Sequence, residues 1–521
     1  QSVHKGEASI ASLPRYMLSV SKLRALVFPI YGFVDIQRFF ALCGIKFFVI
    51  FALTLTRDLK DTLIVTTVGP EAINILKFFG VLPASALFFV GYAKLSNQFS
   101  KNTLWRIIAT PFFLYFVLFG FILYPNRDAL HPVESPPPPE WRHLQYIWGL
   151  WQHWNFALYY VVAELYSSVS VGILFWQFAN DVVPVNKSAE FYPLFSQMSS
   201  LAPICAGYFV ANHCGTNMEV SMRRVSAVVG ICGIVMLLLH YVYTVHLLDE
   251  FPSRLAPKKG KKEKSKMSFS ESMKFMLQSE YLGCMAVLVV AYGVCIQFSD
   301  IMFKSMVPSS CLPTIHVLTL QAFDFAVKVK ELHPDAIAYQ RYFASFSSRV
   351  GVTTFFVIFL GSNVIKRFGW RGGAYATPIV MLLLGTPFFG LLLVSGDSAE
   401  SLALVVAVGS FHAMMSKAMK NAVFDPTTQM AYIPLEEESK VKGKAAVDVM
   451  GSRLGKSGCA LLQQLLVFVF GTIYNAAPAV TVIFYLVCAC WLAACGRLDV
   501  LFAEKKKEAV LRNKLLSEKA N

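Results

Sequence analysis

Charged residues are scarce along this 521-residue chain. They make up 15% of it, against about 25% in soluble globular proteins, while 55% of the residues are hydrophobic. This composition excludes an ordinary soluble enzyme. Apolar runs of membrane-spanning length recur from end to end, so the sequence predicts an all-α, multi-pass membrane protein.

Metal-ligand spacings are also missing. The 11 cysteines lie mostly in apolar segments, and no Cys-x-x-Cys pair or Cys/His spacing suggests zinc. We therefore interpret the cysteines as small packing residues. We expect no metal site and no cofactor.

A complete phosphate-binding loop is absent as well, although GSRLGKSG, residues 451–458, resembles one. The Walker A pattern G-x-x-x-x-G-K-[ST] would need its first glycine at Met450, and no strand is expected before it. We therefore expect no ATP hydrolysis and no enzymatic activity. Lys456 can still contact a phosphate group.

Twelve apolar segments are present, and they fall into two groups of six. The predicted regions are an N-terminal region (1–36), a first six-helix half (37–249), a basic linker (250–275), a second six-helix half (276–497) and a charged C-terminal tail (498–521). Six plus six spans around a central linker is the arrangement of major-facilitator-like transporters, whose halves rock around a site at mid-membrane depth. Residues 306–342 form a long loop that looks inserted, and we expect no substrate contact from it.

Basic residues are distributed unevenly between the two sides of the predicted bundle, in a chain of net charge +15. Both termini, the even-numbered loops and the linker segment Pro257–Lys266 hold most of the Lys and Arg outside the spans, whereas Gly69–Asn74 and Gly471–Ala476 hold none. This bias places both termini on one side of the membrane, which we call the basic side; the other is the neutral side. Because the position between spans explains the charge of the linker, we expect no nucleic-acid partner.

Ionisable residues inside the spans form the candidate site, because each costs about 2.5–3.5 kcal/mol to insert at a membrane centre. They are Arg57, Lys60 and Asp61 in span 1, Glu164 in span 4, Asp300 and Lys304 in span 7, Lys417, Lys420 and Asp425 in span 10, and Arg453 and Lys456 in span 11. Spans 1 and 7 occupy equivalent places in the two halves, so their charged groups are expected to face each other across one cavity. Interfacial charge clusters and local helix salt bridges are the simpler alternatives.

An excess of Lys and Arg among carboxylates suits a polyvalent anion, since Lys binds phosphate as a point charge and Arg binds it in a bidentate manner. Aromatic residues near span 4, among them Trp148, Trp151 and Trp154, are candidates for stacking a base. A belt at the membrane surface, or simple packing, is the alternative for these residues.

Four long segments together resemble the nucleotide transporter family of plastids and obligate intracellular bacteria, the ATP/ADP translocases. They are LTLTRDLKDTLIVT, AELYSSVSVGILFWQFANDVV, FYPLFSQMSSLAPICAGYFV and KNAVFDPTTQMAYIPLEEESKVKGKAAVDVMGSRLGKSGCALLQQ, and the resemblance runs from about Gln37 to Arg497. In detail, the amino-acid sequence of these segments is most similar to that of the diatom plastid members.

This resemblance implies a nucleotide transporter with twelve spans, in a plastid envelope. It implies antiport of ATP against nucleotides such as ADP, with other nucleoside triphosphates, deoxynucleotides and phosphate as further candidate substrates. A proton-coupled nucleotide importer is the alternative, and a monomer in the lipid bilayer is expected. The family's important charged positions fall on Lys60, Glu164, Asp300 and Lys456, where Asp300 replaces a more usual glutamate.

Overall fold

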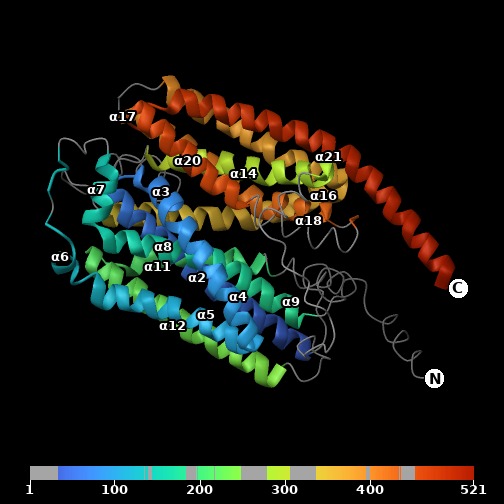
Figure 1. The fold of residues 1–521 in the computed structure, drawn as a ribbon, viewed down its shortest axis with the longest axis horizontal. Helices are drawn as coiled ribbons and strands as arrows, with labels where there is room; N and C mark the ends of the chain where they lie inside the picture. Colours follow the sequence, from blue (N-terminus) through green and yellow to red (C-terminus); the bar gives the residue numbers. More distant parts are fainter. Residues whose placement is uncertain are drawn as a thin grey trace, which may run out of the picture.

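The computed structural model describes residues 33–133, 135–138, 144–183, 195, 197–215, 217–247, 278–305, 336–394, 399–432, 434–435, 447 and 452–520. Across these ranges the regular structure is entirely helical, and no strand is present. The helices run side by side along the long axis of a bundle, with the start of α2 and the end of α21 at one end of it and α6 and α7 at the other (Figure 1). The linker Pro257–Lys266 and most of the expected 306–342 loop lie outside the described residues.

The first half contains α-helices joined by short π-helical segments, which are written η. They are α2 (Phe33–Thr67), α3 (Ala72–Ile75), η1 (Leu76–Val81), α4 (Leu82–Gln98), α5 (Lys101–Leu118), η2 (Phe119–Leu123), α6 (Arg127–Leu130), α7 (Gln145–Gln152), α8 (Trp154–Val169), η4 (Ser170–Gln177), α9 (Phe178–Val182), α11 (Leu201–His213), α12 (Met218–Val242) and η5 (Tyr243–Leu247). π-Helical turns are rare and often mark functional sites.

The second half contains longer continuous helices. They are α14 (Glu280–Ser305), α16 (Ala336–Val394), α17 (Ala399–Met419), η7 (Lys420–Phe424), α18 (Asp425–Ala431), α20 (Ser452–Phe470) and α21 (Ala477–Ala520). α16 joins the eighth and ninth predicted spans across a bend at Gly369, whose φ of 67° favours glycine. The last residues of the expected 306–342 loop already belong to α16, and the C-terminal tail continues α21 as a helix.

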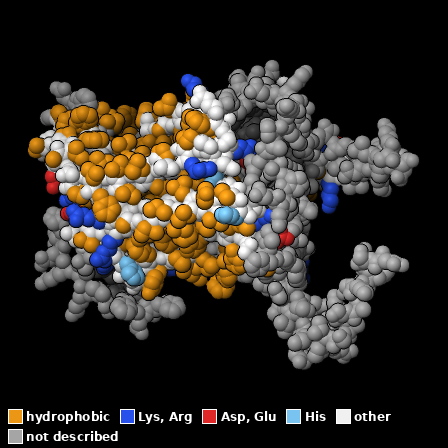
Figure 2. Space-filling model, turned by 90° about the horizontal axis from the view of Figure 1, so that it is seen from below, with side chains coloured by type: hydrophobic (Ala, Val, Ile, Leu, Met, Phe, Trp, Pro, Cys, Tyr) orange, Lys and Arg blue, Asp and Glu red, His pale blue; other side chains and the backbone are white. Residues whose placement is uncertain are grey.

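Nine helices in the described part of the chain are long and apolar enough to cross a membrane. Helices α11, α17 and α20 occupy the places of the other three predicted spans but do not meet that description. Large apolar side chains cover the outside of the bundle, including Leu87, Phe356 and Phe468, each at least 62% exposed, and Figure 2 shows such a surface across one face. A surface of this kind suits lipid rather than water, so the chain is an integral, multi-pass membrane protein.

Direct contacts hold the two halves together toward the neutral side. The Ser221 hydroxyl lies 2.7 Å from the Gln340 amide oxygen, Arg341 donates to the carbonyl of Gly215 at 2.6 Å, and Ser348 donates to the carbonyl of Ile204 at 2.9 Å. These bonds join α11, α12 and the turn between them to the start of α16.

A buried carboxylate, that of Glu71, forms a further contact on the neutral side. Glu71, just before α3, accepts hydrogen bonds from the backbone amide of Ile473 and from the Tyr146 hydroxyl, and burial raises the pKa of its carboxyl group. Since Ile473 follows α20, this bond also joins the two halves. The described contacts between the halves therefore hold the neutral side closed.

Gly207 on α11 allows the closest approach between the halves. A Cβ atom there would overlap the Ala344 carbonyl oxygen and the Ser348 hydroxyl of α16. We expect Gly207→Ala to lower the melting temperature of the purified protein, because the added methyl group would overlap the backbone of α16 and overpacking costs about 1–3 kcal/mol. Gly390→Ala is the matched control, since a Cβ at this helical position meets nothing. Equal melting temperatures of the two variants, measured in detergent, would contradict the close packing.

Candidate functional site

Threonine side chains in the charged part of α2 bond to the backbone of their own helix. Thr54, Thr62 and Thr66 each donate to the backbone carbonyl four residues earlier, at 2.8 Å. A hydroxyl satisfied within its own helix leaves no unpaired donor in a dry environment. The polar segment around Lys60 and Asp61 therefore stays helical.

Lys60 and Asp61 begin a line of charges that runs from the first half into the second. The Lys60 Nζ lies 3.1 Å from Glu164 Oε2 on α8 and 2.8 Å from Asp61 Oδ1. Asp61 Oδ2 in turn lies 2.9 Å from the Nζ of Lys304 on α14. The acidic and basic residues of spans 1 and 7, which were expected to face each other across a cavity, contact each other directly.

The line continues through the second half. Lys304 Nζ lies 2.7 Å from Asp300 Oδ2, one turn earlier on α14, and Asp300 Oδ1 accepts from the Nζ of Lys417 on α17 at 2.9 Å. The complete line, which we call the charge line, consists of Glu164, Lys60, Asp61, Lys304, Asp300 and Lys417. It contains three cations and three anions in strict alternation.

Burial makes the alternation necessary. Side chains of Lys60, Asp61 and Lys304 are 4–8% exposed, and removing ions from water costs several kcal/mol each unless they are paired. The ring of Tyr160 adds a further contact to Lys60, whose Nζ lies 4.0 Å from the ring centroid. Every charge of the line therefore has at least one opposite neighbour within hydrogen-bonding distance.

Arg57 lies beside the charge line, one turn before Lys60 on α2. Its guanidinium contacts Asp58 Oδ1 at 3.4 Å and the Ser347 hydroxyl of α16 at 3.3 Å. Its side chain is 41% exposed. The guanidinium is thus partly accessible, and its bond to Ser347 is one more contact between the two halves.

One predicted supporting residue, Lys420, is paired away from the charge line. Lys420, in η7, pairs with Asp425 at 2.7 Å, and both side chains are over 40% exposed. Lys456 and Arg453 lie on α20, but their side chains fall outside the described part of the structure. Residues 452–458 are helical from the start of α20, rather than a loop after a strand, as a Walker A motif would require.

Three charged residues, two near the charge line and one farther away on α2, were missing from the sequence prediction. Asp58 pairs with Arg57, and Lys77, on η1, interacts electrostatically with four members of the line. Lys46, earlier on α2, is buried against the rings of Phe175 and Trp176. For Lys77 and Lys46, the only indication in the sequence is a single lysine inside an apolar run.

The tryptophans proposed for base stacking have other partners. Trp148 Nε1 donates to the carbonyl of Ser135 at 3.0 Å, and Trp154 Nε1 donates to that of Leu130 at 3.0 Å. Trp151 is 63% exposed. Trp148 and Trp154 thus bind the chain between α6 and α7 and the end of α6, and Trp151 faces outward, so the described contacts favour the alternative of a membrane-surface belt or packing.

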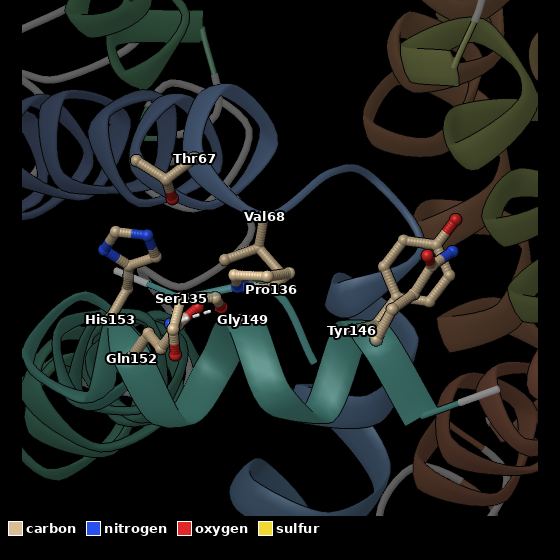
Figure 3. A pocket seen from close by; sticks show the side chains of 9 residues that line it. Thr67, Val68, Ser135, Pro136, Tyr146, Gly149, Gln152 and His153 are labelled. Atoms are coloured by element: carbon tan, nitrogen blue, oxygen red, sulfur yellow. Dashed lines mark hydrogen bonds between the residues drawn. The ribbon is translucent and has the colours of Figure 1, made fainter. Parts of the chain in front are cut away.

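A cavity of about 610 Å³ lies at the neutral end of α2. Thr67 and Val68 form one wall, and α7 with Ser135 and Pro136 forms another, where Gln152 Nε2 donates to the Ser135 carbonyl at 2.9 Å (Figure 3). No carboxylate, Lys or Arg is among its lining residues. The cavity thus offers no charge complementary to a polyanion, unlike the charge line.

The described side chains include no group of three or more His, Cys, Asp or Glu that could hold a metal ion. The charge line alternates carboxylates with ammonium groups, so each carboxylate is already bound by a lysine. A lysine of the line can therefore bind another anion only where a carboxylate gives up its place.

Comparison with solved structures shows the fold. A bacterial homologue of the iron transporter ferroportin, in an inward-facing state, matches with a TM-score of 0.52 at 13% identity, over 91% of this chain and 100% of that one. A POT family transporter in complex with a thioalcohol-conjugated peptide matches with a TM-score of 0.51 at 10% identity, over 88% and 96%. The helical bundle thus shares its overall fold with these two transporters.

Comparison of sequences shows closer relatives. The ADP,ATP carrier protein 1 of Chlamydia pneumoniae is 34% identical over 510 residues, covering 92% of this chain and 94% of the carrier. The chloroplastic ADP,ATP carrier protein 1 of Arabidopsis thaliana is 36% identical over 499 residues, covering 91% and 75%. The ADP,ATP carrier protein 1 of Rickettsia bellii is 32% identical over 503 residues, covering 92% of this chain and 96% of the carrier.

The model of the family described as TLC ATP/ADP transporter matches residues 15–502. That range includes every residue of the charge line and all nine candidate membrane spans except the end of α21. The resemblance read from the sequence motifs is confirmed, and the chain belongs to the TLC ATP/ADP transporter family.

Proposed function

We propose that this protein exchanges ATP for ADP across a membrane by alternating access, with the charge line as the place where the phosphates bind. The observation that carries this proposal is the ion pair between Asp61 and Lys304, 2.9 Å long and buried, which joins the two halves within the line. Membership of the family, whose relatives are named ADP,ATP carriers, supplies the substrate.

The proposed mechanism follows from competition for the lysines. A nucleotide polyphosphate carries several negative charges and many acceptor oxygens, whereas each carboxylate carries one charge. When the phosphates bind Lys60 and Lys304, Asp61 loses both of its partners. The contact between α2 and α14 then weakens, and the halves are free to separate on the neutral side.

The same competition explains why exchange is favoured over one-way transport. In the empty carrier the carboxylates re-form the charge line and hold the halves together, because unpaired buried ions cost several kcal/mol each. Return of the empty carrier is therefore slow, and a counter-substrate such as ADP speeds it. The carrier names of the relatives also favour exchange over the proton-coupled alternative.

The proposed architecture is twelve transmembrane helices in two six-helix halves, residues 37–249 and 276–497. Helices α11, α17 and α20 supply the three spans beyond the nine candidates. α11 packs on α2 and α16, α17 packs on α16 and α14, and α20 packs on α14, which gives each of them a place inside the bundle. Lys456 and Arg453 complete the proposed phosphate site from α20.

A plastid envelope is the proposed location. The chloroplastic relative supports it at 36% identity, while the Chlamydia relative matches nearly as well at 34%. A fluorescent fusion of the protein, expressed in an algal cell, is expected to label a ring around the plastid. Labelling of another membrane would contradict the proposed location and would leave the proposed transport activity unaffected.

Exchange is tested with purified protein in liposomes. Uptake of α-phosphate-labelled ATP is expected only into vesicles preloaded with ADP, and competition with other nucleotides then gives the base range. Uptake into empty vesicles that follows an imposed pH gradient would overturn exchange and support proton coupling. Release of phosphate from ATP by the purified protein would contradict the absence of an enzymatic activity.

A further inference from the structure

Lys77 differs from the lysines of the charge line because no described residue pairs with it. It is partly buried on η1, directly after α3. Lys60, Lys304 and Lys417 each contact a carboxylate at 3.1 Å or less. No hydrogen bond or ion pair joins Lys77 to any residue in the described part of the chain.

Lys77 nevertheless lies next to the line. Its charge interacts with Lys304, Glu164, Lys60 and Asp300, and it also acts on the Cys459 thiol of α20. η1 packs against both α8 and α20. Lys77 therefore lies where the first half meets α20, close to both ends of the Lys60–Asp61–Lys304 segment.

Local packing explains how η1 reaches this place. Gly80 follows Lys77 by one turn, and a Cβ atom at Gly80 would come within 2.9 Å of Val161 Cγ2 on α8. Val161 precedes Glu164 by one turn on that helix. The missing side chain lets η1, which holds Lys77, lie against α8, and π-helical turns are often found at functional sites.

Lys77 adds a positive charge to a group of described residues that is otherwise neutral. The charge line is neutral with three cations and three anions, and Arg57 is balanced by Asp58. Lys77 leaves this group with one uncompensated positive charge. An isolated lysine at this depth is costly and usually has a functional reason.

We propose that Lys77 is the first phosphate contact of an incoming nucleotide; this inference rests on the proposed exchange function. The paired lysines bind phosphate only after a carboxylate has left them, whereas Lys77 binds it at once. A phosphate held at Lys77 is then placed to displace Glu164 and Asp61 from Lys60. Lys77 thus sets the affinity for the polyphosphate rather than the rate of switching.

Substitution separates affinity from rate. Lys77→Gln is expected to raise the KM for ATP about tenfold, as expected for loss of one charge-assisted hydrogen bond, with a smaller change in the maximal rate. Lys77→Arg keeps the charge and is expected to stay within about threefold of the parent KM. Lys94→Gln is the matched control, because Lys94 is exposed on α4 in the same candidate span.

Restoring the charge chemically guards against a variant that is merely misfolded. Lys77→Cys protein in liposomes is treated with 2-aminoethyl methanethiosulfonate, which attaches a positive group, or with the 2-sulfonatoethyl reagent, which attaches a negative one. The first is expected to lower the KM toward the parent value, and the second is not. The parent chain, with exposed Cys205 and Cys490, is treated in parallel.

The outcomes distinguish this inference from the proposed function. If the parent protein exchanges ATP for ADP but Lys77→Gln has the parent KM, the role of Lys77 is wrong and exchange stands. Equal recovery with both reagents would also overturn it, because the charge would then not matter. If the parent protein shows no exchange with ADP-loaded vesicles, the proposed function fails first.

Discussion

Lys304→Gln is expected to reduce ATP/ADP exchange by roughly a hundredfold or more and to lower the melting temperature of the purified protein. Lys304 bridges Asp61 and Asp300, and removing one partner of a buried ion pair costs about 3–5 kcal/mol. The variant leaves three carboxylates and two lysines in the charge line. Both exchange in liposomes and thermal unfolding in detergent are measured.

The double variant Asp61→Asn with Lys304→Gln separates charge balance from transport. It leaves two neutral pairs, Glu164 with Lys60 and Asp300 with Lys417. We expect the melting temperature to recover most of the loss seen with Lys304→Gln, while exchange stays low because the pair that joins the halves is gone. A double variant less stable than Lys304→Gln alone would contradict the charge line as a coupled unit.

Lys60→Gln is expected to abolish exchange while leaving the protein inserted in the membrane. Lys60 is the only described residue that binds both Glu164 and Asp61, at 3.1 and 2.8 Å, and in the proposed mechanism its ammonium group receives a phosphate. Loss of a buried charged partner corresponds to about 3–5 kcal/mol, which is roughly a hundredfold or more in rate.

Lys101→Gln is the control for that experiment. Lys101 also contacts a carboxylate, that of Asp181 at 2.6 Å, but its side chain is 52% exposed. Exposed pairs contribute only about 0.2–1 kcal/mol, so exchange by this variant is expected to match the parent. Parent-level exchange by Lys60→Gln, with equal protein in the vesicles, would remove Lys60 from the phosphate site.

The central part of the site was predictable because its residues carry strong local signals. Asp300 and Lys304 are spaced as a helix ion pair, and the equivalent places of spans 1 and 7 led to the expectation that Asp61 and Lys304 would face each other. The structure brings them into direct contact. A charge inside an apolar run is costly wherever the helix packs, so it can be recognised without knowing its neighbours.

Other features depend on packing that one-dimensional patterns do not contain. Lys420 has the same local appearance as Lys417, yet the π-helical η7 directs it to Asp425 and away from the line. Lys77 is a single lysine whose position depends on Gly80 and α8. The expected break between spans 8 and 9 is a bend at Gly369 within α16, because one glycine with positive φ turns the chain without a loop.

A reversible cross-link between the halves tests alternating access most directly. The Ser221 hydroxyl and the Gln340 amide oxygen lie 2.7 Å apart across the closed neutral side. The variant with cysteine at both positions is cross-linked in liposomes with a short bifunctional methanethiosulfonate reagent, which replaces the length of the lost glutamine side chain, and each single variant is a control. We expect the cross-linked double variant to lose ATP/ADP exchange and to regain it with a reductant. Full exchange by protein in which the cross-link is verified would contradict separation of the halves on that side.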